Sequence, residues 1–354
     1  MNDSDILKIR LHNQLLDGYS LKEPEEIVSW MGAMQAQALD IAKWALGARL
    51  ENSSVKTIED ALTDGKIIRT HILRPTWHFV AAEDIHWMRK LSVEKLRAVY
   101  ISYGKSWGAD EDLILKTRLA VTNILEKHDY LYKQEIDEHL KAIGHDVDPH
   151  TLSHALSHSE LEGIICNGKI SGQNHSYALL EKRVLNAKVF IKEEALKQLA
   201  FKYFSSHGPA TLQDFIWWSG LTATEAKAGL ESVKNHFISE KINEKIFWMK
   251  PDIQIPENKK PSALLLPPFD EFVVSYKDRS EIIEKEHHSK VMTKNGIFSP
   301  TIMLNGEIIG SWKKIKKKNK VQVELKFFEK TNKKTVDLYK NEIKRVEEFY
   351  AIQE

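Results

Sequence analysis

The stretch "MGAMQAQALDIAKWALGARL", residues 31–50, places two glutamines, Gln35 and Gln37, between two apolar patterns of helical spacing. In a continuous helix, side chains two residues apart point to nearly opposite faces, whereas an extended or turning backbone can direct both to one side. The stretch therefore predicts a break between two helices at the glutamines. Either the two amides are polar surface residues at this junction, or they are directed together at a ligand.

A pattern of two helices followed by two short strands occurs three times along the chain. The three copies run from "EPEEIVSWMGAM" to "KIIRTHILRPTWHFVA", from "YKQEIDEHLKAIG" to "IICNGKISGQNHSYALL", and from "HGPATLQDFIWWSG" to "HFISEKINEKIFWMK". Pro149 suits a first helical turn, and Thr222 with Glu225 has capping-box spacing. Two helices and a hairpin are typical of a winged helix. We therefore predict a winged helix with supporting helices at residues 1–128, a second at 129–186 and a third at 187–255.

In the last segment, residues 256–354, strand patterns replace the helical patterns that dominate the earlier part of the chain. The stretches "SALLLPPFDEFVVSY", "PTIMLNGEIIGSW" and "KVQVELKFF" have the pattern of strands, and Asn305-Gly306 is a strong hairpin signal. A helix with regularly spaced apolar residues closes the chain. We expect a C-terminal β-barrel with a terminal helix, and an α+β, mainly α fold for the whole chain.

Composition places few limits on function. The chain has 354 residues, 42% of them hydrophobic, and a formal net charge of +1, so charge alone indicates no partner. Its single cysteine, Cys166, excludes an intrachain disulfide framework and is typical of a reducing compartment. The sequence shows neither a secretory leader nor an apolar run of about 20 residues. We therefore expect a cytoplasmic protein that acts at the bacterial nucleoid, not at a membrane.

Polar residues are concentrated in "IIRTHILRPTWHFV", which otherwise has the composition of strands. The candidates are Arg69, Thr70, Arg74, Thr76 and His78. Such a polar stretch does not suit a sheet buried on both faces. These residues either line a cleft or form a hydrogen-bond network that braces the first winged helix.

Two other groups of residues have alternative interpretations. His150, His154 and His158 are four residues apart, which puts them on one helical face. A metal site would need ligands from a second element, so a solvated or phosphate-facing stripe is favoured, and no metal or cofactor is expected. The run "KKIKKKNK", residues 313–320, is either a solvated loop or a group of phosphate contacts.

Five blocks of sequence, in the same order, resemble the winged-helix DNA glycosylases of the AlkZ/YcaQ group. They are "MGAMQAQALDIAKWALGARL", "GKIIRTHILRPTWHFV", "HGPATLQDFIWWSGL", "LLPPFDEFVVSYKDRS" and "MLNGEIIGSWKK". The resemblance extends over nearly the whole chain. It implies three tandem winged helices and a C-terminal β-barrel in a C-shaped molecule that grips double-stranded DNA. It further implies base excision repair of alkylation damage, in which N7-alkylated purines are removed, in some members from interstrand crosslinks.

By its motif, the resemblance makes Gln35 and Gln37 the catalytic pair and places the chain in the Gln-x-Gln branch. DNA contacts or support of the motif are expected from a larger set: Arg69, Thr70, Arg74, Thr76, His78, Lys313, Lys314 and Lys316. The family's grip on DNA also implies a monomer.

The chemistry agrees with such a pair. An N7-alkylated purine carries a positive charge, so its glycosidic bond breaks without protonation of the base. A glutamine amide does not titrate, but its carbonyl can orient a water molecule. We therefore expect a monofunctional glycosylase, a hydrolase of N-glycosyl bonds. The alternative is a winged-helix DNA-binding protein without catalysis, either a regulator or a lesion-recognition factor.

Overall fold

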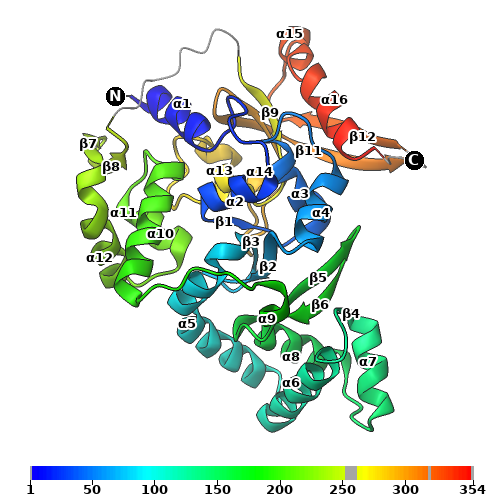
Figure 1. Cartoon of the computed structure of the whole chain (residues 1–354). Helices are drawn as coiled ribbons and strands as arrows, with labels where there is room; N and C mark the ends of the chain where they lie inside the picture. The colour runs from blue at the N-terminus through cyan, green and yellow to red at the C-terminus, as the bar shows by residue number, and fades with distance from the viewer. Residues whose placement is uncertain (1, 252–260, 318–319, 352–354) are drawn as a thin grey trace.

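The computed structural model describes residues 2–251, 261–317 and 320–351. Over these ranges the chain is a mainly helical α+β protein with four small antiparallel sheets (Figure 1), which confirms the expected class. Among the described residues, no helix combines the length and the apolar character needed to cross a membrane.

In the first segment, a short strand ends at Gln35, the first glutamine of the pair. β1 (Ala33–Gln35) follows α2 (Pro24–Met31), and α3 (Leu39–Gly47) begins beyond Gln37. Gly32 makes the turn from helix to strand with a φ of 82°, a conformation that favours glycine. The backbone is therefore extended at Gln35. The other elements of this segment are α1 (Asp3–Asn13), α4 (Val55–Thr63), β2 (Ile67–His71) and β3 (Trp77–Ala81), and the sheet has the order β1-β3-β2.

Residues 85–183, called the second segment from here on, form the lower part of Figure 1; they include two helices, at 85–106 and 111–125, that fall in the unit predicted at 1–128. After the long α5 (Ile85–Ser106), it has the order helix, short strand, two helices and hairpin. These elements are α6 (Glu111–Leu125), β4 (Leu131–Tyr132), α7 (Lys133–Ala142), α8 (Pro149–Leu161), β5 (Ile165–Ser171) and β6 (Asn174–Leu179), followed by α9 (Leu180–Arg183). Pro149 occupies the first turn of α8, as expected.

The third segment repeats this order, with a single bridge between Ala210 and Trp248 in place of the short strand. Thr222 and Glu225 form the expected capping box. The elements are α10 (Lys192–His207), α11 (Leu212–Ser219), α12 (Ala223–Val233), β7 (Ile238–Ile242) and β8 (Lys245–Met249).

The last segment contains an open four-stranded sheet of order β12-β11-β10-β9, so the expected barrel is wrong for the described residues. β9 (Ala263–Leu266) pairs with β10 (Thr301–Leu304) over four positions, whereas β11 (Glu307–Lys317) and β12 (Lys320–Phe327) form a longer hairpin. The two edge strands, β9 and β12, do not pair with each other, so the sheet stays open. Instead α16 (Lys340–Phe349) packs against both of them. α13 (Glu271–Val274), α14 (His288–Val291) and α15 (Lys333–Asp337) complete the segment.

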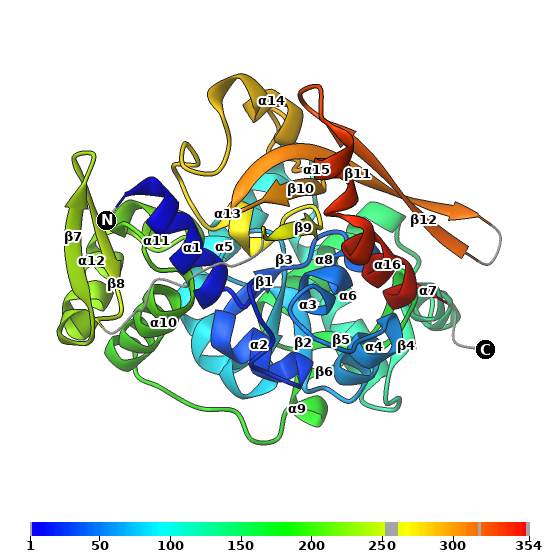
Figure 2. The same cartoon turned by 90° about the horizontal axis from the view of Figure 1, so that it is seen from above.

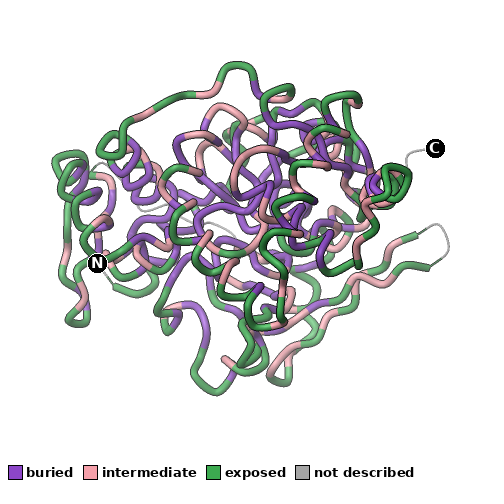
Figure 3. The backbone as a smooth tube through the Cα atoms, turned by 90° about the horizontal axis from the view of Figure 1, so that it is seen from below, coloured by how far each residue is buried: buried purple, intermediate pink, exposed green. Residues whose placement is uncertain are grey.

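The structure shows the geometry of two features that the sequence singled out in this segment, the turn at Asn305-Gly306 and the lysine-bearing hairpin. Asn305 and Gly306 turn the chain between β10 and β11 with φ values of 53° and 93°. The β11–β12 hairpin extends away from the body of the molecule (Figure 2), and its residues are mostly exposed or partly buried (Figure 3). It thus presents Lys313, Lys316 and Lys317 on an accessible arm, whereas residues 318–319 of the lysine run lie outside the described residues.

The sheet of the first segment separates two hydrophobic cores. Met34 and Phe79 pack in a core shared with α3, α16 and the C-terminal sheet. Ala33 and Val80, which point to the opposite face, pack in a core shared with α5, α10 and α11. A third core lies within the second segment. β1 therefore runs through the middle of the molecule, where both of its faces are covered.

A buried ion pair connects the first and last segments. Arg49 donates hydrogen bonds of 2.8 and 2.9 Å to the two carboxylate oxygens of Asp270, and both side chains are fully buried. Because removal of one partner leaves an unpaired buried charge, we expect Asp270→Ala to lower the free energy of unfolding by about 3–5 kcal/mol. Urea denaturation would measure this loss.

The matched control is Asp60→Ala, which removes an exposed ion pair with Lys56. We expect that change to cost less than about 0.5 kcal/mol. Equal small losses in both variants would contradict the structural role of the buried pair.

Candidate active site

The sheet of the first segment aligns three of the polar residues singled out in the sequence. His78 on β3 pairs with Gln35 on one side and with Thr70 of β2 on the other. Directly paired residues of an antiparallel sheet direct their side chains to the same face. Gln35, His78 and Thr70 therefore form a row across one face of the sheet, with Thr70 buried at its inner end.

The two glutamine amides meet each other at the end of this row. Gln35 Nε2 lies 3.4 Å from Gln37 Oε1, a long hydrogen bond. Gln37 Oε1 also accepts a hydrogen bond of 3.3 Å from Thr76 Oγ1, and Gln35 Oε1 accepts one of 3.0 Å from Arg74 Nη2. Gln35 is only 9% exposed, whereas Gln37 is exposed. The pair thus consists of an inner amide and an outer amide.

Arg74 determines the orientation of the Gln35 amide, and it adds to the effect of burial on the protonation of His78. A flipped Gln35 amide would turn its NH2 group toward the guanidinium, so the carbonyl must face Arg74. His78 Nδ1 lies 3.0 Å from the carbonyl of Thr76, which can only accept, so this nitrogen carries the proton. His78 Nε2, 3.4 Å from Arg74 Nη2, is then an acceptor. Burial, together with the charge of Arg74, lowers the pKa of His78 to about 3, and the imidazole is neutral.

Glu271, to which the sequence analysis gave no role, lies beneath the pair. One carboxylate oxygen accepts a hydrogen bond of 2.6 Å from the main-chain N–H of Gln35. The other accepts from Trp218 Nε1, at 3.0 Å, and from the hydroxyl of Ser275. Burial alone would raise the pKa of Glu271, but His207, whose Nε2 lies 3.8 Å from the carboxylate, and the charge of Arg74 lower it to about 2.

A signal for Glu271 was present in the sequence. Asp270 and Glu271 are adjacent acids inside the apolar run "LLLPPFDEFVV". Buried carboxylates require hydrogen-bonding partners, so two of them in such a run indicate a structural or functional centre.

Arg69 holds the same loop from the opposite side. It pairs with Phe79 in the sheet, so it faces away from the row that contains Gln35. Its guanidinium donates hydrogen bonds to the carbonyls of Ala36, at 3.0 Å, and Gln37, at 3.3 Å. The same group lies 4.5 Å from the ring centre of Trp77. Burial lowers the pKa of Arg69 to about 10. With 4% of its surface exposed, Arg69 supports the backbone of the loop and is not placed to contact phosphates.

The three candidate lysines on β11 have different surroundings. Lys314 donates a hydrogen bond of 2.6 Å to Asp40 and lies 3.8 Å from the ring centre of Tyr350. Burial lowers its pKa, and it connects β11 to the start of α3. Lys313 and Lys316 are exposed. By strand alternation, Lys316 shares a face with Lys314, whereas Lys313 points to the other face.

The histidine stripe of α8 packs against aromatic rings. His154 lies near Tyr100, Tyr103 and Trp107, with ring centres 5.6–6.1 Å apart, and Tyr100 stacks on His158. Burial lowers the pKa of His154, and burial with the charge of Arg118 lowers that of His158 to about 4. Neutral imidazoles do not suit the phosphate-facing stripe favoured by the sequence analysis.

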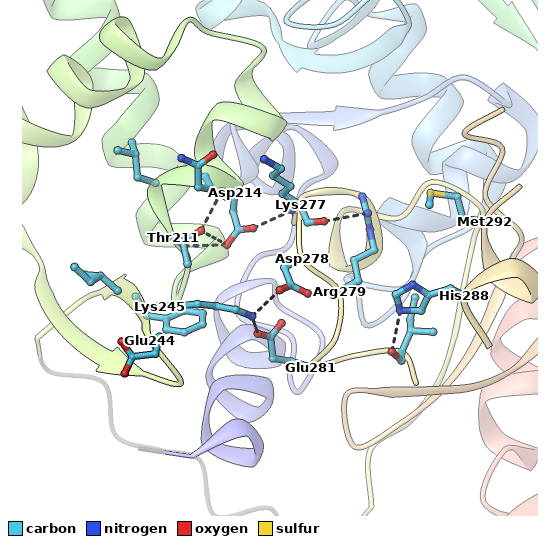
Figure 4. Close-up of a pocket in the computed structure, with 15 residues that line it drawn as sticks. Thr211, Asp214, Glu244, Lys245, Lys277, Asp278, Arg279, Glu281, His288 and Met292 are labelled. Carbon is cyan, nitrogen blue, oxygen red and sulfur yellow. Dashed lines mark hydrogen bonds and ion pairs between the residues drawn. The ribbon is translucent and has the colours of Figure 1, made fainter. Parts of the chain in front are cut away.

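A cavity of about 840 Å³ lies apart from these residues, between the β7–β8 hairpin, the start of α11 and the loops after α13 (Figure 4). Three of its charged groups form ion pairs: Lys245 bonds to Asp278 at 2.7 Å and to Glu281 at 2.8 Å. The backbone N–H of Lys277 donates to Asp214 at 2.9 Å. Neither glutamine lines this cavity.

Comparison with known proteins defines the class. The DNA glycosylase AlkZ-like family (AlkZ-like) matches residues 28–349. The chain belongs to this family of DNA glycosylases. A search of curated proteins gives no match. Among solved structures, the chain is similar to the Streptomyces sahachiroi DNA glycosylase AlkZ. The TM-score is 0.77 and the identity 17%, and the match covers 100% of this chain and 99% of that chain. The two proteins therefore share a fold, and the family expected from the sequence is confirmed.

The neutral His78 leads to a prediction about acid stability. In the unfolded chain a histidine binds a proton below about pH 6.5, whereas folded His78 stays neutral down to about pH 3. Between these values the unfolded state binds more protons, so stability falls as the pH falls. We expect His78→Gln to make this dependence shallower by up to about 1.4 kcal/mol per pH unit between about pH 6 and about pH 4.

Urea denaturation at a series of pH values would test this expectation. The control is His12→Gln, since that imidazole is 58% exposed. If wild type and His78→Gln show the same pH dependence, the neutral buried state assigned to His78 is wrong.

Proposed function

We propose that the protein is a monofunctional DNA glycosylase that hydrolyses the N-glycosidic bond of N7-alkylated purines in double-stranded DNA. The single observation that supports this best is the convergence of Gln35 and Gln37, which are held by Arg74 and Thr76 in a chain of the AlkZ-like family. The proposal includes membership of the Gln-x-Gln branch and action on interstrand crosslinks.

On the basis of their hydrogen bonds, we assign different parts to the two amides. A carbonyl oxygen has two lone pairs. Gln37 Oε1 already accepts from Gln35 Nε2 and Thr76 Oγ1, so both of its lone pairs are engaged. Among the described residues, Gln35 Oε1 accepts from Arg74 alone, which leaves one lone pair for a water molecule. Gln35 therefore orients the nucleophile, and Gln37 fixes the position of Gln35.

The reaction requires no acid or base from the protein. The water oxygen bonds to C1′ while the bond between C1′ and the purine breaks. The electron pair of the broken bond neutralises the cationic purine, and the proton of the water passes to solvent. The amide dipole stabilises the positive charge that develops on the sugar. An unmodified purine is a poor leaving group, so these amides do not suffice to remove it.

The surroundings keep the site close to electrical neutrality. Arg74 would repel both a cationic base and a cationic sugar. The buried carboxylate of Glu271 offsets this charge, and His78 adds none. The site is thus compatible with a substrate that carries its own positive charge.

Binding of DNA is assigned to the repeated units and to the exposed lysines. We assign the three repeats of helices and hairpin as winged helices, and Lys313 and Lys316 on the β11–β12 arm as phosphate contacts. The active unit on the duplex is a monomer.

Release of N7-methylguanine from duplex DNA is the direct test. Under single-turnover conditions, we expect Gln35→Ala and Gln37→Ala each to lower the rate by about 10²-fold, the effect of losing one group that positions or stabilises the transition state. Gln134→Ala, which changes an exposed glutamine on α7, serves as the control and should keep the wild-type rate. Undiminished release from both active-site variants would disprove the catalytic assignment.

The second candidate is a DNA-binding protein without catalysis. The low exposure of Gln35 and its bond to Arg74 favour it, because a buried, hydrogen-bonded amide also serves a structural role. Duplex binding by the wild-type protein, with no release of base from any alkylated duplex, would establish this function instead.

A further inference from the structure

A cavity of about 440 Å³ lies between α5, α8 and the start of β3. Most of its wall consists of rings, contributed by Trp77, Tyr100, Tyr103, Trp107, His150 and His154. Its volume lies within the range of about 300–1,000 Å³ that is usual for small-molecule sites. Two of the three histidines that the sequence placed on one helical face, His150 and His154, thus form part of a ring-lined cavity.

This cavity adjoins the candidate catalytic residues. Pro75 and Trp77 are part of its wall, and Thr76, the residue between them, donates the hydrogen bond to Gln37 Oε1. The carbonyl of Trp77 accepts a hydrogen bond of 2.7 Å from the N–H of Ala36, which lies between the two glutamines. The same three-residue segment therefore supports the amide pair and forms one wall of the cavity.

The rings are arranged around His154, which is 8% exposed. Trp107 contacts it edge-on with ring centres 5.6 Å apart, while Tyr100 and Tyr103 are tilted against it at 5.9 and 6.1 Å. Trp107 also lies 5.9 Å from His150. Tyr103 is 57% exposed, so it presents an accessible ring at the mouth of the cavity.

The lining is suited to flat rings and not to phosphates. None of the described residues that line the cavity is Lys, Arg, Asp or Glu. Burial lowers the pKa of His154, so its imidazole is neutral near pH 7 and adds an uncharged ring. Aromatic side chains bind nucleobases and other planar rings by stacking, with little dependence on sequence.

We propose that this cavity is a stacking subsite for one planar aromatic ring carried by the DNA substrate. The ring has two chemical sources: a nucleobase displaced from the duplex beside the lesion, or an aromatic group that is part of a bulky N7 adduct. The proposal rests on the proposed function, since it is that function that brings DNA to Gln37. It adds a specificity determinant outside the amide pair.

Binding to duplexes that cannot be cleaved tests the subsite separately from catalysis. In one arm, a duplex with a single bulged adenine is compared with the same duplex bearing an abasic bulge. In the other, 2′-fluoro N7-benzylguanine is compared with 2′-fluoro N7-methylguanine. In one of the two pairs, we expect the wild-type protein to bind the ring-bearing duplex about tenfold more tightly than the duplex without the ring. We expect Tyr103→Ala to bind both duplexes of that pair with similar affinity.

The control is Tyr130→Ala, which removes an exposed tyrosine that does not line the cavity and should keep the preference. If Tyr103→Ala loses the preference in the bulge arm, the ring is a displaced base. If it loses the preference in the benzyl arm, the ring belongs to the adduct. If wild type shows no preference in either arm, or if Tyr103→Ala retains it, the subsite is disproved. Because no base is released in these assays, the outcome does not depend on whether the protein is a glycosylase.

Discussion

Two adjacent buried carboxylates, Asp270 and Glu271, hold three segments of the chain together around Gln35. Asp270 pairs with Arg49 of the first segment. Glu271 accepts hydrogen bonds from the backbone of Gln35 in the first segment and from Trp218 in the third. A buried carboxylate is tolerated only when its oxygens are paired, so each of these bonds fixes a distance between segments far apart in the sequence. The position of Gln35 is thus determined by the packing of the last segment as much as by its own strand.

Two arginines then fix the glutamine loop from opposite faces of one sheet. Arg74 orients the side chain of Gln35, while Arg69 binds the carbonyls of Ala36 and Gln37. The charge of Arg74 is offset by Glu271, and His78 remains neutral. The charges around the loop are thus largely offset, which suits the reaction proposed above, in which the substrate supplies the positive charge and the amides position a water molecule.

Parts of the fold and the site could be predicted because they depend on local chemistry. The extended backbone at Gln35 follows from two polar residues two positions apart between helical patterns, and the cap at Thr222 follows from its spacing to Glu225. The expected barrel was wrong because strand patterns do not show which strands pair: β9 and β12 are edge strands, and α16 packs against both of them. Lys314 was grouped with its neighbours because sequence does not show that its partner, Asp40, lies across the fold.

The sequence by itself determined the residue types of the site, the family and the mainly helical class, since these rest on motifs and periodicity. Only the tertiary structure decided which residues act together. It placed Arg69 and Arg74 on opposite sides of the glutamine loop, brought Glu271 beneath Gln35, and made His150 and His154 of α8 part of the wall of an aromatic cavity. The physical reason is that hydrogen bonds and ring contacts act over a few ångströms between atoms. Periodicity shows the direction in which a side chain points from its own element, but not what lies opposite it.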